Sequence, residues 1–137
     1  MHPFHLAVPV HDLDAARSFY ALLGARLAVE QDHAHIWDFH GHQVVTHVVA
    51  GYDARDAGSN HVDLHNVPVP HFGLVLDLPA WQELRDRLVA AGTEFIIKPH
   101  ERYQDTTGAQ WTMFLRDPSG NALEFKAFED PARAFSR

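Results

Sequence analysis

The stretch His5-Leu-Ala-Val-Pro-Val10, and its later repetition, decides the fold. Leu6, Val8 and Val10 are apolar and alternate with less apolar residues. Alternation with a period of two predicts a strand that buries one face. His5 falls on the other face of this strand, together with Ala7. We therefore expect a strand with one apolar face and one partly polar face.

A helix and three short strands are expected to follow. Apolar side chains recur at helical spacing over residues 13–23. Asp12 can cap the start of this helix, and Gly24 can end it in a left-handed conformation. The three strand candidates that come next cover about residues 26–30, 34–40 and 43–49.

The pattern restarts at His71-Phe-Gly-Leu-Val-Leu76 and continues into a second amphipathic helix that ends at Gly92. Strands are expected near residues 94–97, 111–115 and 121–128, with a polar loop from about 98 to 109. The sequence thus predicts one domain of the α+β class. It contains two βαβββ modules in tandem, at about 1–52 and 69–130, with a linker at about 53–68. We expect a curved, half-barrel mixed sheet with the helices on the outside.

Bulk composition excludes several classes of protein. The 137 residues suit a single domain, and 46% of them are hydrophobic. A net charge of −7 argues against nucleic acids and anionic membranes as partners. The absence of cysteine excludes disulfides, thiolate metal sites and a cysteine nucleophile. No apolar run is long enough to span a membrane, and no signal peptide is visible, so we expect a cytoplasmic protein.

Position in the repeat selects three residues as candidate metal ligands. His5 and His71 open equivalent strands and lie on the face away from the helices. Glu124 lies in the middle of the last strand, where a carboxylate is costly unless it is paired or binds a cation. Two imidazoles and one carboxylate are typical ligands of Fe(II) and related metals. The alternatives are that each His is solvated and that Glu124 pairs with Lys126 or an arginine.

Three stretches, His5 to Tyr20, His71 to Leu76 and Asp117 to Phe125, resemble the vicinal oxygen chelate superfamily. This superfamily includes glyoxalase I, extradiol dioxygenases, fosfomycin-resistance thiol transferases and bleomycin-binding proteins. The resemblance implies that His5, His71 and Glu124 bind one divalent metal, and that a small-molecule substrate binds that metal through two neighbouring oxygens. It also implies a homodimer, with a metal site built within one chain or across two.

The resemblance leaves several reactions open. When Gly41 is aligned with Gly120, Val45 takes the place of a fourth carboxylate ligand that glyoxalase I normally has. Gln43 and His47 flank Val45 on the same face. Three ligands favour an extradiol-type dioxygenase on Fe(II) or Mn(II). The alternatives are a lyase or thiol transferase on Ni, Zn or Mn, and a binding protein without catalysis.

The residues that would move protons are less clearly marked. The extradiol pattern is incomplete, because Phe114 stands where a tyrosine is usual. His42, His47 and Tyr103 are the candidate catalytic residues, although each has a structural or solvated alternative. Arg102 lies in the expected loop at 98–109, and loops at a cavity mouth often select substrates. An acidic or phenolic ligand that meets Arg102 is therefore part of the hypothesis.

Overall fold

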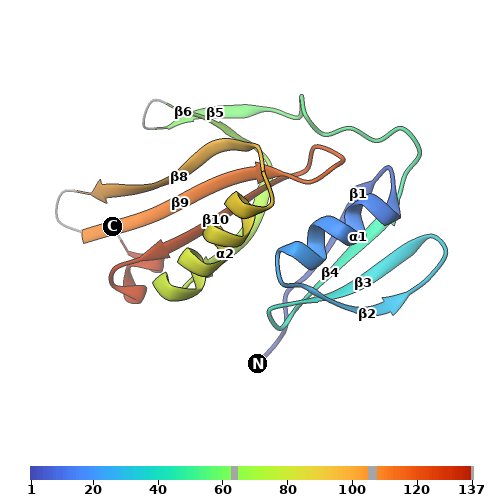
Figure 1. Cartoon of the computed structure of the whole chain (residues 1–137), viewed down its shortest axis with the longest axis horizontal. Coiled ribbons are helices and arrows are strands. Elements are labelled where there is room, and N and C mark those ends of the chain that lie inside the picture. The colour runs from blue at the N-terminus through green and yellow to red at the C-terminus, as the bar shows by residue number, and fades with distance from the viewer. Residues whose placement is uncertain (63–64, 105–107, 137) are drawn as a thin grey trace. The chain divides into compact units, whose positions relative to one another are not determined.

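The computed structural model describes residues 1–62, 65–104 and 108–136, and it divides into two compact units (Figure 1). Unit 1 comprises residues 1–56 and 117–121. Unit 2 comprises residues 57–116 and 122–137. None of the helices in these described ranges is long and apolar enough to cross a membrane.

Unit 1 contains the first βαβββ module. Its elements are β1 (His5–Val10), α1 (Leu13–Leu22), β2 (Arg26–Glu30), β3 (Ala34–Phe39) and β4 (His42–Val48). The strands form a mixed sheet in the order β1-β4-β3-β2. β1 runs parallel to β4, and the other neighbours are antiparallel.

Unit 2 repeats this arrangement after a short hairpin. Its elements are β5 (Ser59–Val62), β6 (His65–Pro68), β7 (His71–Leu76), α2 (Leu78–Ala90), β8 (Phe95–Gln104), β9 (Gly108–Arg116), β10 (Ala122–Phe128) and the 3-10 helix η1 (Pro131–Phe135). The large sheet has the order β7-β10-β9-β8, and β7 runs parallel to β10. The two sheets share one topology, so the α+β class with two tandem βαβββ modules is confirmed.

Two segments contain more strand than the sequence pattern predicts. The expected polar loop at 98–109 is largely a hairpin, because β8 continues to Gln104 and β9 begins at Gly108. A strand ladder needs only backbone groups, so polar side chains do not prevent it. Pro99 has no N–H to donate, and the pairing shifts register between Ile97 and His100. Within the expected linker, residues 59–62 and 65–68 pair as the antiparallel strands β5 and β6.

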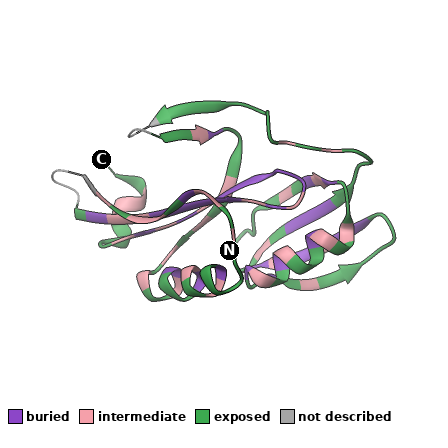
Figure 2. Cartoon of the chain, turned by 45° about the horizontal axis from the view of Figure 1, so that its top comes forward, coloured by how far each residue is buried: buried purple, intermediate pink, exposed green. Residues whose placement is uncertain are grey.

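The predicted alternation in β1 is present. Val8 and Val10 are buried, whereas His5 is exposed. Asp12 caps α1, and its carboxylate accepts the backbone N–H groups of the second and third residues after it. Figure 2 shows buried residues along the strands and on part of each helix. The helix side of each sheet is therefore apolar, which leaves the other face for polar side chains.

A buried carboxylate organises the turn between β9 and β10, which belongs to unit 1. Asp117 is 2% exposed. Its Oδ1 accepts the backbone N–H groups of Ser119 and Asn121, each at 2.9 Å. Its Oδ2 accepts the Tyr20 hydroxyl at 2.9 Å and Asn121 Nδ2 at 2.8 Å. Four donors offset the cost of burying the charge.

Burial, followed by the neighbouring Asp117 charge and hydrogen bond, raises the pKa of Tyr20 well above its usual value of 10.0. At neutral pH we expect Tyr20→Phe to lower the free energy of unfolding by about 2 kcal/mol, because a hydrogen bond to a charged group is lost. Above pH 10 the unfolded phenol ionises while the folded one stays neutral, so the parent loses stability as pH rises. The difference in free energy of unfolding between the parent and Tyr20→Phe should therefore become smaller above pH 10.

Urea denaturation followed by tryptophan fluorescence, at pH 7 and at steps above pH 10, measures this difference. Tyr52→Phe, in the loop after β4, is the matched control and should show neither effect. If the parent and Tyr20→Phe differ in free energy of unfolding by the same amount at every pH in this range, the raised pKa of Tyr20 is contradicted.

Candidate metal centre

His5 presents one free ring nitrogen in unit 1. It lies at the start of β1, directly opposite Gln43 of β4. Its Nδ1 is 2.6 Å from Gln43 Oε1. An amide oxygen only accepts hydrogen bonds, so Nδ1–H is the donor and Nε2 keeps its lone pair. Metal-binding histidines are commonly oriented in this way by a carbonyl oxygen behind the ring.

His71 has the same arrangement in unit 2, at the start of β7. Its Nδ1–H donates to the backbone oxygen of Pro68 at 2.7 Å, which again leaves the Nε2 lone pair. The ring packs edge-on against Phe114, with 5.0 Å between ring centroids. The two histidines that open equivalent strands are therefore held in the same tautomer by different oxygens.

Glu124 lies on β10, and its side chain is 11% exposed. Lys126 Nζ is 3.2 Å from its Oε1, and the Thr112 hydroxyl donates to its Oε2 at 3.4 Å. The pairing with Lys126, one of the alternatives in the sequence, is thus present in the structure. Gly73 of β7 lies opposite Glu124, and a Cβ at Gly73 would collide with the Glu124 carbonyl oxygen.

One cavity in unit 2 brings His71 and Glu124 together. Its volume is about 220 Å³. Strands β7 to β10 contribute six of its polar lining residues: His71, His100, Arg102, Thr112, Glu124 and Lys126. His65 and Val67 of β6 also line it. They were not predicted as site residues, because the hairpin is short and polar. The β5–β6 hairpin is therefore part of the candidate site.

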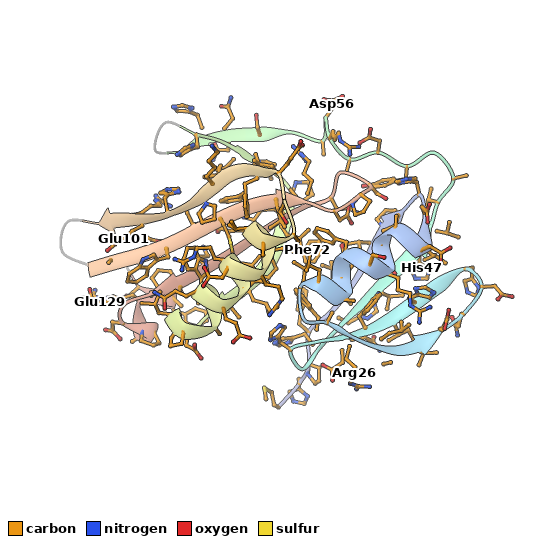
Figure 3. The ribbon with its side chains drawn as sticks, in the orientation of Figure 1. Arg26, His47, Asp56, Phe72, Glu101 and Glu129 are labelled. Carbon is orange, nitrogen blue, oxygen red and sulfur yellow. The ribbon has the colours of Figure 1, made fainter. Side chains whose placement is uncertain are left out.

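A second cavity, in unit 1, has a volume of about 360 Å³ and is lined by His5, His42 and Gln43, among others. His42 Nδ1 accepts the backbone N–H of Phe4 at 3.0 Å, so a neutral His42 ring carries its proton on Nε2. His47, labelled in Figure 3, is exposed and is not among the described residues that line this cavity. Tyr103 lies on β8, but its side chain is outside the described part of the chain.

Strand register shows why the two modules differ. Val45 pairs with Ala7, two residues after His5, and Glu124 pairs with Gly73, two residues after His71. Val45 is therefore the counterpart of Glu124, and it is buried. The candidate set has three ligands, drawn from both units. Among the described residues, no three His, Asp or Glu side chains are grouped as a metal site.

Known proteins resemble the chain over nearly its whole length. The chain shares 32% identity with a glyoxalase/bleomycin resistance protein/dioxygenase from Alicyclobacillus acidocaldarius, at a TM-score of 0.78, with 98% of this chain and 96% of that chain covered. The fosfomycin resistance protein FosX from Listeria monocytogenes has 15% identity and a TM-score of 0.68, with 93% of each chain covered. Lactoylglutathione lyase from Agrobacterium tumefaciens has 17% identity and a TM-score of 0.65, with 99% and 97% covered.

The last two similarities show the shared fold alone. No curated protein matches the chain. The family model for the Glyoxalase/Bleomycin resistance protein/Dioxygenase superfamily matches residues 2–125. The chain belongs to this superfamily.

Proposed function

We propose that the chain is a metal-dependent enzyme in which His5, His71 and Glu124 hold one divalent metal. One observation carries the proposal. Both histidines donate Nδ1–H to a carbonyl oxygen, so both present an Nε2 lone pair, from equivalent places in the two modules. Two imidazoles and one carboxylate suit Fe(II) or Mn(II), and they also accept Ni or Zn. The donor set therefore fits the metal that the family resemblance implies.

A metal held there would act as a Lewis acid and as a template for two neighbouring substrate oxygens. The chain's own residues orient its ligands. Gln43 fixes the His5 ring, and the backbone oxygen of Pro68 fixes the His71 ring. Thr112 donates to Glu124 and so holds the carboxylate rotamer. Such outer partners raise ligand basicity and restrict ring orientation.

Within this proposal the reaction is of the extradiol dioxygenase type, on a catechol-like substrate. Its support is the apolar Val45 at the position where a fourth carboxylate would stand. His42 carries its proton on Nε2 when neutral, so it serves as a hydrogen-bond donor. His47 and Tyr103 remain the other proposed proton carriers. A lyase or thiol transferase is the alternative reaction, and we place the enzyme in the cytoplasm as a homodimer.

A second candidate function is a small-molecule binding protein that performs no chemistry. The Lys126–Glu124 ion pair favours it, because Lys126 supplies Glu124 with a cation without any metal. Metal content separates the two candidates.

Elemental analysis of the purified protein is expected to find about one divalent metal ion for each set of the three ligands, since three protein ligands suffice for tight binding. His5→Ala, His71→Ala and Glu124→Ala should each abolish it. Gln43→Ala removes only the partner of His5 and should weaken metal binding by about 10- to 100-fold. His33→Ala and Glu101→Ala, both at exposed positions, are matched controls that should retain the metal.

A metal-free parent, or full occupancy in all three ligand variants, would refute the metal proposal. Oxygen uptake with a panel of catechols then separates the dioxygenase from the lyase or transferase, because only the dioxygenase consumes oxygen.

Lys126→Met tests the ion pair. In the metal-free protein we expect it to lower the free energy of unfolding by about 1–2 kcal/mol, because a largely buried carboxylate loses its partner and Lys126 itself is part-exposed. Metal affinity should rise, since the ammonium no longer competes for Glu124. Thermal unfolding and a chelator-competition titration measure the two effects. Lys98→Met, which removes the only other lysine of the sequence, is the control. If Lys126→Met and the parent bind metal with equal affinity, Lys126 does not compete with the metal for Glu124.

A further inference from the structure

Two histidines that the proposed metal centre does not use lie beside each other in the cavity of unit 2. His65 belongs to β6 and His100 belongs to β8, and both line this cavity. Their ring centroids are 5.5 Å apart, and their ring planes make an angle of 36°. Within the described chain β6 pairs with β5, whereas β8 is an edge strand of the larger sheet (Figure 1). Imidazoles from two strands that do not pair with each other therefore meet at this point.

Strand register directs one imidazole of the β5–β6 hairpin toward the cavity and another away from it. His65 and Val67 are two residues apart on β6, so they share a face, and both line the cavity. His61 of β5 pairs with Asn66, which lies between them on β6. Directly paired residues point to the same side of a sheet, so His61 lies on the opposite face from His65. His61 is thus a built-in comparison for His65.

His100 presents a free ring nitrogen, as His71 does. Its Nδ1 is 2.8 Å from the backbone oxygen of Lys98, which only accepts hydrogen bonds, so Nδ1–H donates and Nε2 keeps its lone pair. His100 pairs with Thr112, which also lines the cavity. Among the residues that the structure describes, none makes a hydrogen bond to the His65 ring. Both rings can therefore offer a nitrogen lone pair to a ligand.

The separation of the two rings fits one shared metal ion. Metal–nitrogen distances of about 2.0–2.1 Å at tetrahedral angles place the centroids of two imidazoles on one ion roughly 5 Å apart. A separation of 5.5 Å needs only a small rotation of the rings to reach this geometry.

The chemistry of the donors selects the kind of ion. Two neutral imidazoles supply no negative charge, and the cationic side chains of Lys126 and Arg102 also line the cavity. Ions that depend on carboxylate and carbonyl oxygens, such as Ca(II) and Mg(II), are therefore disfavoured. Imidazole suits Zn(II), Ni(II) and Cu(II), whose affinity comes from the bond to nitrogen.

We propose that His65 and His100 form a second metal site, distinct from the proposed metal centre, that takes a nitrogen-preferring divalent ion such as Zn(II). Water completes the coordination, because no third His, Asp or Glu of the described chain is grouped with the pair. The bound ion links β6 to β8 and so joins the β5–β6 hairpin to the larger sheet. The inference does not depend on the proposed function, because it uses none of the three ligands of that centre.

Calorimetric titration of the metal-stripped full chain with Zn(II) tests this site. His65→Ala and His100→Ala should each weaken the same binding event by at least about tenfold, because loss of a ligand costs no less than loss of an outer partner. His61→Ala removes an imidazole from the other face of the hairpin, so it is the matched control and should bind Zn(II) as the parent does. Titration with Ca(II) should show no binding that depends on His65 or His100.

Thermal unfolding with and without Zn(II) gives an independent measurement. An ion that binds only the folded pair should raise the unfolding temperature of the parent and of His61→Ala more than that of His65→Ala. His65 is exposed, so its replacement should leave the fold intact. His100 is half-buried, so His100→Gln, which keeps a polar side chain there, accompanies His100→Ala.

Zn(II) binding that is unchanged in both variants, or weakened in only one of them, would overturn the inference, since a shared ion needs both rings. Loss of the same ion in His71→Ala would also overturn it, because the pair would then belong to the first centre. If His71→Ala and Glu124→Ala lose no metal while His65→Ala does, the proposed function fails and the second site stands. If only the variants of the first centre lose metal, the second site alone fails.

Discussion

The Asp117 carboxylate is the interaction on which the placement of the candidate site depends. It is buried, and its four donors come from α1 and from the turn that it begins. Asp117 N–H also donates to Asn121 O at 2.9 Å, which closes the turn directly before β10. Because side chains alternate along a strand, the start of β10 determines which face receives Glu124. A slip of one residue would turn the carboxylate into the apolar, helix-covered face.

The two modules share a fold, but they contribute different numbers of candidate metal ligands. Each opens with a histidine whose Nδ1–H is held by a carbonyl oxygen, from Gln43 in unit 1 and from Pro68 in unit 2. The shared topology requires apolar residues on the helix side only, so the residues of the other face can differ between the modules. In unit 2, the residue paired two positions after the histidine is the carboxylate Glu124. In unit 1, the equivalent residue is Val45. Gly73 accompanies that carboxylate, since no side chain fits against the Glu124 backbone.

Local signals in the sequence predicted most of the fold. Asp12, Gly24 and Gly92 mark helix ends and act within one helical turn. The alternation in β1 spans six residues. Both signals can therefore be recognised from short stretches of sequence. The hairpin between β8 and β9 was not predicted, because backbone pairing accepts polar residues as readily as apolar ones. The His5, His71 and Glu124 set followed from the repeat. The Lys126–Glu124 pair was among the alternatives in the sequence, since residues two apart in a strand share a face. The roles of Gln43 and the β5–β6 hairpin depend on cross-strand register, which no local pattern reveals.

The ion pair between Lys126 and Glu124 explains how a carboxylate can stand in a largely buried strand before any ligand arrives. An unpaired carboxylate at 11% exposure would be costly, and Lys126, on the same strand face, offsets that cost. A cation that bound Glu124 would have to displace the Lys126 ammonium, because both would use the same carboxylate.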